Sequence, residues 1–170
     1  MSLPQLRLDN QLCFLFHRIG RELNAAYRPL LADLGLTYSQ YLVMLVLWER
    51  DGLGVGELGD RLDLDSGTLS PLLRRLERAG LVRRERATSD ERRVTIHLTG
   101  RGRDLQERAA GIPEAIAGCV VDDEAGYEAM KAQLNDLAAR IALSRADGSG
   151  GSGPGQEQGA HHAYAITTAR

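Results

Sequence analysis

The sequence predicts a mainly α-helical domain with one small β-hairpin, and three observations support this fold class. Apolar residues recur at helical spacing through most of the 170 residues, which is the pattern of amphipathic helices. Strict alternation of apolar and polar residues is confined to a short stretch before residue 99. Residues 148–170 begin with a run of Gly and Ser, so we expect a disordered tail there, after a single domain at residues 1–147.

The first two helices follow from apolar spacing and a capping motif. Residues 8–31 carry apolar side chains every three to four positions, which predicts an amphipathic helix. Thr37, with Gln40 three positions later, has the spacing of a capping box. The helix that this box starts, residues 38–50, is apolar on nearly all sides, so we expect it at the centre of the core. Gly52 is expected to end it.

Two helices joined by a tight turn come next. Residues 55–62 predict the first helix, and residues 63–64 form the turn. Asp65 or Ser66 then caps a longer helix, and Gly80 marks its end. The inward-facing residues of this helix are Leu69, Leu72, Leu73, Leu76 and Ala79. Such a pair, with small polar residues at the start of the second helix, is typical of a helix-turn-helix.

A β-hairpin follows this helix pair directly. Residues 81–86 are expected to be extended, and residues 87–92 are expected to form a polar tip. Val94, Ile96 and Leu98 alternate with polar residues and predict the second strand. A hairpin at this place is a wing. The predicted fold is therefore a winged helix-turn-helix of the α+β class, mainly α with a small β wing.

Two helical segments are predicted after the wing. Thr99 is expected to cap a helix that runs to about residue 118, with an interruption near Gly111 and Pro113. Asp122 or Asp123 then starts a last helix. The apolar stripe of that helix consists of Tyr127, Met130, Leu134, Leu137 and Ile141.

Charge is distributed unevenly along the chain. The net charge is −2, yet residues 74–103 contain ten arginines against four acidic residues. A basic stretch in a nearly neutral protein fits a surface that faces DNA phosphates. On charge alone, a solvated charged face explains this stretch equally well.

The helix-turn-helix and the wing select candidate DNA contacts. The second helix of such a motif enters the major groove and reads base edges from its N-terminus. The candidates on this helix are Ser66, Thr68, Ser70, Arg74 and Arg75. The candidates on the wing are Asp90, Arg92 and Arg93.

Each group of candidates also has a purely structural explanation. For the recognition helix, the structural explanation is that Ser66 or Thr68 only caps the helix. At the wing, Asp90 can hold the guanidinium of Arg92 ready for the minor groove. The alternative is a surface ion pair worth less than about 1 kcal/mol.

Composition argues against several other classes. No apolar run approaches the roughly 20 residues that span a bilayer, and the N-terminus lacks the pattern of a signal peptide. We therefore expect a cytoplasmic protein without a membrane partner. Cys13 and Cys119 are too few for a disulfide scaffold and lack the spacing of metal ligands. We expect no metal, no cofactor and no enzymatic activity. In a reducing compartment, such cysteines are either buried and inert or redox-active.

Several segments resemble a known regulator family. The segments Leu81-Val82, residues 90–93 and Leu98-Thr99 resemble the wing of MarR-family winged helix-turn-helix regulators. Residues 8–14, 36–41 and 65–77 resemble one branch of that family, the organic-hydroperoxide-sensing (OhrR-type) repressors. The resemblance covers about residues 8–105 and extends only loosely to the last helices.

The resemblance implies a homodimeric repressor of transcription. Its DNA-binding part is expected at about residues 37–99, and its dimerisation helices are expected at about residues 8–31 and 99–145. Two-fold symmetry would place two recognition helices on adjacent major grooves. The operator in double-stranded DNA is therefore expected to be an inverted repeat.

The resemblance also implies a redox site. It gives Cys13 the role of a peroxidatic cysteine, which an organic hydroperoxide oxidises before the repressor releases its operator. Tyr27 and Tyr38 match tyrosines whose hydroxyls donate hydrogen bonds to this sulfur, which favours the thiolate. His17 lies one turn after Cys13, where some relatives carry a third tyrosine. Cys119 resembles a resolving cysteine, which condenses with the oxidised Cys13 of the other subunit.

Simpler interpretations of these residues stay open. Without the resemblance, Cys13 in an apolar helix is more typical of an inert buried thiol. His17 is equally well explained as a helix histidine without a role. Cys119 is alternatively a surface thiol, in which case small thiols resolve the oxidised cysteine.

Three other functions stay open as well. The first is a MarR-type repressor that a small aromatic ligand releases, and dependence on Cys13 distinguishes it. The second is a thiol peroxidase, which sustained consumption of peroxide would favour. The third is a structural DNA-binding protein without a switch, which peroxide-insensitive DNA binding would favour.

Overall fold

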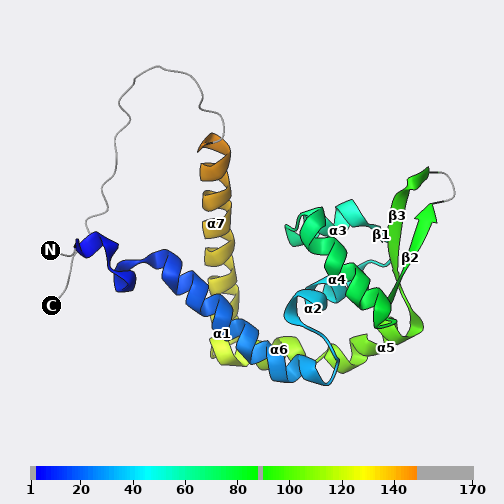
Figure 1. Cartoon of the computed structure of the whole chain (residues 1–170). Coiled ribbons are helices and arrows are strands. Elements are labelled where there is room, and N and C mark those ends of the chain that lie inside the picture. The colour runs from blue at the N-terminus through cyan, green and yellow to red at the C-terminus, as the bar shows by residue number, and fades with distance from the viewer. Residues whose placement is uncertain (1–2, 88–89, 149–170) are drawn as a thin grey trace, which may run out of the picture. The chain divides into compact units, whose positions relative to one another are not determined.

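The computed structural model describes the backbone of residues 3–87 and 90–148 and the side chains of residues 3–85 and 94–144 (Figure 1). The chain forms two compact units, Met1–Asp122 and Asp123–Arg170, and each is described by itself. Beyond Gly148, the expected C-terminal tail lies outside the described residues. No helix within the described part of the chain is long and apolar enough to cross a membrane.

The first helix, α1, spans Leu12–Ala32 and follows two 3₁₀ turns, Pro4–Leu6 and Leu8–Asn10. The regular helix therefore starts later than the predicted residue 8. The side chain of Gln11 holds the preceding turns, because its amide donates hydrogen bonds to the carbonyls of Gln5, at 2.7 Å, and Arg7, at 3.2 Å.

The second helix, α2, spans Tyr38–Glu49, and its predicted capping box is confirmed. The Thr37 N–H donates to the side-chain oxygen of Gln40 at 2.8 Å, and the Gln40 N–H donates back to Thr37 Oγ1 at 3.4 Å. The prediction that Gly52 ends this helix is wrong by a few residues. Arg50 is already extended, and Gly52 lies in the turn that leads to the next strand.

The helix-turn-helix consists of α3 (Val55–Leu62) and α4 (Ser66–Arg78), as predicted. Asp63, between them, has a φ of 51° in the left-handed region, which turns the chain. Asp65, not Ser66, is the N-cap of α4. At the other end, Gly80 has a φ of 70° and the Leu81 N–H donates back to the Leu76 carbonyl at 3.0 Å, which is the predicted C-terminal stop.

The sheet has three antiparallel strands in the order β1-β3-β2. Their bounds are Leu53–Gly54 for β1, Val82–Ala87 for β2 and Asp90–Leu98 for β3. The predicted wing is confirmed, but its tip is shorter than predicted. The strands pair as far as Ala87 and Asp90, so residues 90–92 belong to β3 and not to the tip. The sequence does not predict β1, because two residues are too few to show alternation.

Two helices follow the wing within the first unit, α5 (Gly100–Ala109) and α6 (Ile112–Val120). The Thr99 hydroxyl caps α5 as predicted and accepts the Gly102 N–H at 3.0 Å. The predicted interruption near Gly111 is also confirmed, since the two helices are separate. The second unit contains α7, Glu124–Gly148. Its cap is Asp123, whose carboxylate accepts the Gly126 N–H at 2.7 Å.

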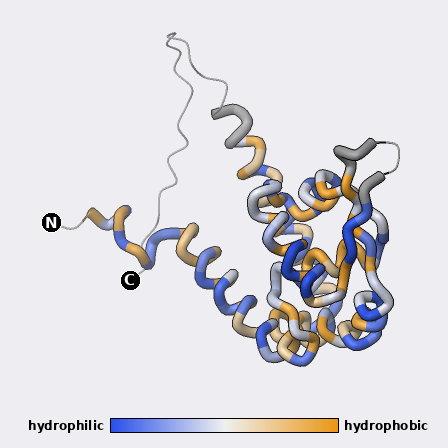
Figure 2. Tube along the Cα trace, turned by 45° about the vertical axis from the view of Figure 1, so that its right-hand side comes forward, coloured by the Kyte–Doolittle hydropathy of each residue, from blue (hydrophilic) through white to orange (hydrophobic). Residues whose placement is uncertain are grey.

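The core of the first unit is built around α2, as its apolar sequence predicts. Tyr41, Val43, Met44 and Leu47 of this helix are almost fully buried. Leucines of α4 and Ile96 of β3 pack in the same core. In α1, by contrast, apolar and polar stretches alternate along the helix (Figure 2), and its apolar side chains before residue 20 are mostly exposed.

Candidate functional site

The N-terminus of α4 is exposed and firmly capped. Asp65 accepts the Thr68 N–H with one carboxylate oxygen and the Thr68 hydroxyl with the other, both at 2.9 Å. These hydrogen bonds, the one from the backbone first, lower the pKa of Asp65. Because the Thr68 hydroxyl donates its proton to Asp65, it can only accept a hydrogen bond from a donor group of the DNA. Ser66 is exposed at the first position of the helix.

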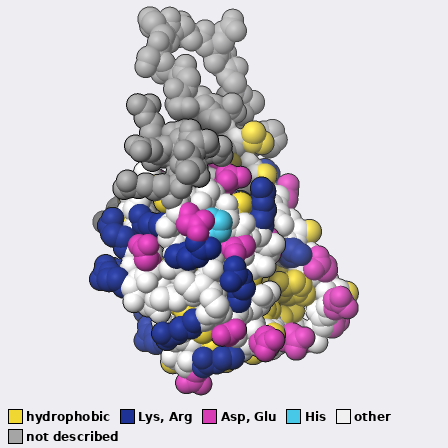
Figure 3. Space-filling model, turned by 90° about the vertical axis from the view of Figure 1, so that its right-hand side faces the viewer, with side chains coloured by type: hydrophobic (Ala, Val, Ile, Leu, Met, Phe, Trp, Pro, Cys, Tyr) yellow, Lys and Arg dark blue, Asp and Glu magenta, His cyan; other side chains and the backbone are white. Residues whose placement is uncertain are grey.

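The remaining predicted DNA contacts on α4 lie along one to two further turns. Ser70 is half-buried, whereas Arg74 and Arg75 are exposed. Glu77 forms an ion pair with Arg84 of β2 at 3.4 Å, which joins α4 to the wing. Figure 3 shows Lys and Arg side chains spread over the face on the side of the helix-turn-helix and wing, with acidic side chains among them. The exposed cations on this face are suited to contacts with phosphates.

The predicted wing contacts lie in the first half of β3. Asp90, Arg92 and Arg93 all belong to this strand, and Asp90 pairs with Ala87 across the hairpin. Their side chains lie outside the described residues. The predicted interaction of the Asp90 carboxylate with the Arg92 guanidinium therefore stays a prediction from the sequence.

Four aromatic side chains from α1 and α2 form a continuous cluster. The ring centroids of Tyr27 and Tyr38 lie 4.6 Å apart, and those of Tyr27 and Tyr41 lie 5.9 Å apart. Trp48 extends the cluster, with its ring edge-on to Tyr41 at 6.1 Å. Burial raises the pKa of Tyr38 and of Tyr41, and the neighbouring Tyr38 raises the pKa of Tyr41 further. Tyr38 and Tyr41 therefore keep their hydroxyl protons at neutral pH and can donate hydrogen bonds.

Cys13 lies far from this cluster within one protomer. It is the second residue of α1 and an exposed free thiol. Tyr27 comes fourteen positions after Cys13 in the same helix, which corresponds to about 21 Å along the helix axis. The structure thus brings Tyr27 and Tyr38 together but leaves Cys13 apart from both.

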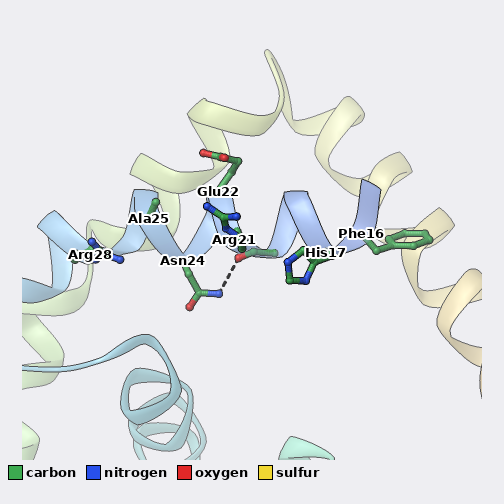
Figure 4. A pocket seen from close by; sticks show the side chains of 8 residues that line it. Phe16, His17, Arg21, Glu22, Asn24, Ala25 and Arg28 are labelled. Atoms are coloured by element: carbon green, nitrogen blue, oxygen red, sulfur yellow. Dashed lines mark hydrogen bonds between the residues drawn. The ribbon is translucent and has the colours of Figure 1, made fainter. Parts of the chain in front are cut away.

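His17 lies one turn after Cys13 on the same side of α1 and is exposed. It lines a shallow concave surface along the helix together with Phe16, Arg21 and Arg28. Figure 4 shows His17 and Phe16 at one end of this surface and Arg28 at the other. The histidine is therefore accessible from solvent on the side of Cys13.

Cys119 lies in the last turn of α6 and is also an exposed free thiol. Its Sγ donates a hydrogen bond to the carbonyl of Ala115 at 3.3 Å, one turn earlier. Both cysteines lie on helices outside the helix-turn-helix and the wing, and these two helices pack against each other. Neither thiol is buried, so the interpretation of Cys13 as a buried inert residue does not hold for this protomer.

Two helices expose apolar side chains that a protomer alone does not cover. On α1 these residues are Leu12, Leu15, Phe16 and Ile19, and on α7 they are Tyr127, Met130, Leu134, Ile141 and Leu143. Where exposed apolar side chains gather on a soluble protein, they usually mark a surface that contacts another chain. Both helices belong to the segments that the sequence predicts as dimerisation helices.

The Asp51 carboxylate joins distant segments through hydrogen bonds that the sequence did not predict. One of its oxygens accepts the Leu98 N–H at 2.8 Å, and the other accepts from the Arg103 guanidinium at 2.8 Å. Burial alone raises the pKa of Asp51, but the hydrogen bonds from Leu98, Arg103 and Gly52 outweigh it, and the pKa lies below its ordinary value. The only local signal was a carboxylate directly before Gly52 at the end of a helix.

Comparison with known proteins identifies similar regulators. The family model of the transcriptional regulator SarA/Rot matches residues 25–108. The chain is 45% identical over 132 residues to the organic hydroperoxide resistance transcriptional regulator of Bacillus subtilis, which covers 78% of this chain and 90% of that protein. It is also similar to reduced AbfR bound to DNA, with a TM-score of 0.72, 39% identity, and coverage of 84% of this chain and 98% of that chain.

AbfR, a protein of Staphylococcus epidermidis, is also matched in a second state. The structure of disulfide-formed AbfR has a TM-score of 0.56 and 41% identity, and it covers 82% of this chain and 92% of that chain. This chain therefore superposes less well on the disulfide form of AbfR than on its reduced, DNA-bound form.

Proposed function

Because the chain belongs to the MarR family of winged helix-turn-helix transcriptional regulators, and within it to the group of the organic hydroperoxide resistance regulators, we propose that it is a repressor that releases its operator when an organic hydroperoxide oxidises Cys13. One observation carries this proposal. The chain combines a helix-turn-helix and wing with two exposed free thiols on the helices outside them. Such a regulator acts in the cytoplasm, where promoter DNA is accessible.

The DNA-binding part uses α4 as its recognition helix. Ser66 and Ser70 contact bases or phosphates from the N-terminal turns. Thr68 donates hydrogen bonds to the capping Asp65 and accepts a hydrogen bond from a donor group of the DNA. Arg74 and Arg75 contact phosphates or guanine. The wing adds Arg92, oriented by Asp90, in the minor groove, with Arg93 beside it. Two such units in a homodimer require an inverted-repeat operator.

The redox site is completed across the dimer. Within one protomer, Cys13 and the pair of Tyr27 and Tyr38 are separated by about 21 Å of helix, so a hydrogen bond between them needs a second copy of the chain. The exposed apolar residues at the start of α1 support burial of this segment against such a copy. There the tyrosine hydroxyls donate to the Cys13 sulfur and favour its thiolate. His17, one turn away, adds to this when protonated.

The proposed chemistry balances as two steps. The Cys13 thiolate attacks the terminal oxygen of the hydroperoxide, the O–O bond breaks, and the alkoxide leaves and takes a proton to give an alcohol. The sulfur is then a sulfenic acid. The Cys119 thiol of the other subunit attacks this sulfur, an S–S bond forms, and water leaves. The two electrons that reduce the hydroperoxide thus come from two thiols, which end as one disulfide.

A second candidate function is release by a small aromatic ligand. A cavity of about 330 Å³ lies between α2 and the α5–α6 region, and its lining favours a flat apolar molecule. The residues that line it include Tyr41, Leu45, Trp48, Ala109 and Pro113. This mechanism would not need Cys13, which makes the two functions separable by one substitution.

Operator binding under oxidation tests the proposal. A labelled duplex with the promoter of the chain's own gene is titrated with the reduced protein, before and after treatment with cumene hydroperoxide. We expect the peroxide to release the parent protein and to leave Cys13→Ser bound. Release of both proteins at the same dose would contradict thiol sensing. Release of both by aromatic acids without peroxide would support the second candidate instead.

A further inference from the structure

The first turn of α5 meets the end of α2 and the base of the wing at one point. The carboxylate of Asp51, just after α2, accepts the Leu98 N–H at the base of the wing and the Arg103 guanidinium from α5, both at 2.8 Å. The Trp48 indole N–H of α2 donates to the Gly102 carbonyl at 2.9 Å. We call these five residues, Trp48, Asp51, Leu98, Gly102 and Arg103, the α5 junction.

The α5 junction also holds the end of the recognition helix. A side-chain Cβ at Gly102 would lie 2.1 Å from the Leu81 carbonyl oxygen, so only glycine allows α5 to approach the chain here. That same oxygen accepts the Thr99 N–H at 3.0 Å. Leu81 comes directly after Gly80, which ends α4. Displacement of the start of α5 would therefore move the chain that links the recognition helix to the wing.

On the wing side, the junction reaches β3 through two consecutive residues. The Gly52 N–H donates to the Asp51 carboxylate at 2.9 Å and to the Ile96 carbonyl at 3.1 Å. Leu53 of β1 then pairs with Ile96 in the ladder. The Asp51 carboxylate is thus the point where the end of α2, the base of β3 and the first turn of α5 are joined.

An exposed ion pair such as this one contributes little to stability. The side chains of Arg103 and Asp51 are 56% and 31% exposed, and pairs of this kind are typically worth less than about 1 kcal/mol. The carboxylate nevertheless makes the side-chain link between α5 and the base of the wing. A role in transmitting movement fits this arrangement better than a role in holding the fold.

We propose that Asp51, through its bond to Arg103, is a positioning residue that carries movement of α5 and α6 to the wing when the regulator is oxidised. The inference rests on the proposed function, because Cys119 lies on α6 and its disulfide bond would displace that helix. Movement of α6 reaches α5 across the Gly111 break, and Asp51 then draws the base of β3 with it. Without the link, movement of α5 would reach the wing only through the backbone at Thr99, the one residue between β3 and α5, and less of it would arrive at the base of β3.

The test compares the reduced and disulfide-bonded forms of matched variants. Asp51→Asn keeps an oxygen for the Leu98 and Gly52 N–H groups but loses the pairing with Arg103, and Arg103→Gln removes the same bond from the other side. Arg101→Gln is the control. It removes an arginine from the same helix turn, and Arg101 is exposed and forms no ion pair among the described residues.

The measured quantity is the ratio of operator Kd in the disulfide form to that in the reduced form, by fluorescence anisotropy with the labelled promoter duplex. Coupled sites typically change affinity by about 5–150-fold. We expect a ratio in this range for the parent and for Arg101→Gln, and a ratio at least about fivefold smaller for both junction variants. The double variant should lower the ratio no further than either single variant, because both remove one bond.

Non-reducing electrophoresis and thermal unfolding accompany each titration. Junction variants that form the disulfide as fully as the parent but keep its Kd ratio would overturn the inference. Variants that only unfold at lower temperature and bind more weakly in both states, with an unchanged ratio, would show a purely structural role and overturn it too. If the parent forms the disulfide and keeps its operator, the proposed function itself is wrong, and the inference falls with it.

Discussion

The ring of Tyr27 lies 4.6 Å from the ring of Tyr38, which joins α1 to the start of α2. The pKa of Tyr38 is raised by burial, so its hydroxyl carries a proton throughout the physiological pH range. A protonated phenol is a donor and can stabilise a thiolate, whereas a phenolate would repel one. The two tyrosines therefore fit a pocket that receives the Cys13 sulfur of a second subunit.

Replacing either tyrosine by phenylalanine should slow oxidation of Cys13 without weakening DNA binding by the reduced protein. A hydrogen bond to a charged group contributes about 1.5–3 kcal/mol, so Tyr27→Phe and Tyr38→Phe should each slow the reaction with cumene hydroperoxide about tenfold or more. Trapping of the sulfenic acid with a labelled dimedone probe measures the rate. Tyr127→Phe, an exposed tyrosine of α7, is the control. Equal rates in all three variants would contradict the assignment.

Cys13→Ser should leave operator affinity unchanged and abolish release by organic hydroperoxide. The reason is that Cys13 lies on α1, away from α4 and the wing, and that only a thiol can form the sulfenic acid. Gel shifts over a range of cumene hydroperoxide concentrations measure the effect. Cys119→Ser serves as a comparison, because it keeps the first oxidation step. A serine variant that dissociates at the parent's dose would refute the role of Cys13.

Arg92→Ala should weaken operator binding by about 1–3 kcal/mol, the usual cost of a lost groove contact. The prediction depends on the position of Arg92 in the wing, two residues after Asp90. Titrations at physiological salt measure it, and a Kd equal to that of the parent would reduce the pair to a surface ion pair. Arg101→Gln controls for the loss of one positive charge.

The acid dependence of stability should report on Asp51. Its pKa in the folded protein lies below the ordinary value of 3.8, so the folded state favours the carboxylate. The stability that this preference contributes is fully present above pH 3.8 and is lost as the pH falls through the lowered pKa. Asp51→Asn should therefore be less stable than the parent at neutral pH, and the difference should shrink on acidification. Urea unfolding at several pH values tests this, and a difference that does not vary with pH would contradict it.

Local patterns in the sequence predicted most of the fold. The Thr37 and Gln40 capping box, the stop at Gly80 and the alternation from Val94 to Leu98 each depend on residues close together in the chain, and each is confirmed. β1 was missed because its two residues acquire a strand partner only through Ile96, far along the chain. The wing tip was predicted too long, because Asp90, Glu91 and Arg92 are all polar and no apolar residue among them shows the alternation of a strand.

The candidate sites were less predictable, because they depend on distant contacts. Asp51 meets Leu98 and Arg103 at separations of 47 and 52 residues, and no spacing rule covers such pairs. Asp65 was one of the two residues anticipated as the cap of α4, and the hydrogen bond that shows it to be the cap comes from Thr68, only three residues away. The proposed contact of Cys13 with Tyr27 and Tyr38 cannot be derived from the fold of one protomer, because Cys13 lies apart from both tyrosines there.

Oxidation should link Cys13 to Cys119 of the other subunit. Both thiols are exposed in the protomer and lie on α1 and α6, which belong to the predicted dimerisation helices. A disulfide needs Cα atoms about 4.4–6.8 Å apart, so a reduced dimer with a wider separation would have to move one helix end to form it. The two wings would then no longer match successive grooves. A small shift suffices, because specific binding exceeds non-specific binding by only about 4–10 kcal/mol.

Non-reducing electrophoresis after treatment with cumene hydroperoxide tests this linkage. A covalent dimer should appear in the parent and be absent from both Cys13→Ser and Cys119→Ser, because each variant lacks one of the two sulfur atoms. Mixing the two serine variants is a sharper test. In a heterodimer, one subunit supplies Cys13 and the other supplies Cys119, so a single intersubunit disulfide can form and a covalent dimer should reappear. If the oxidised parent runs only as a monomer yet leaves DNA, Cys119 is not the resolving residue, and a mixed disulfide with a small thiol becomes the better explanation.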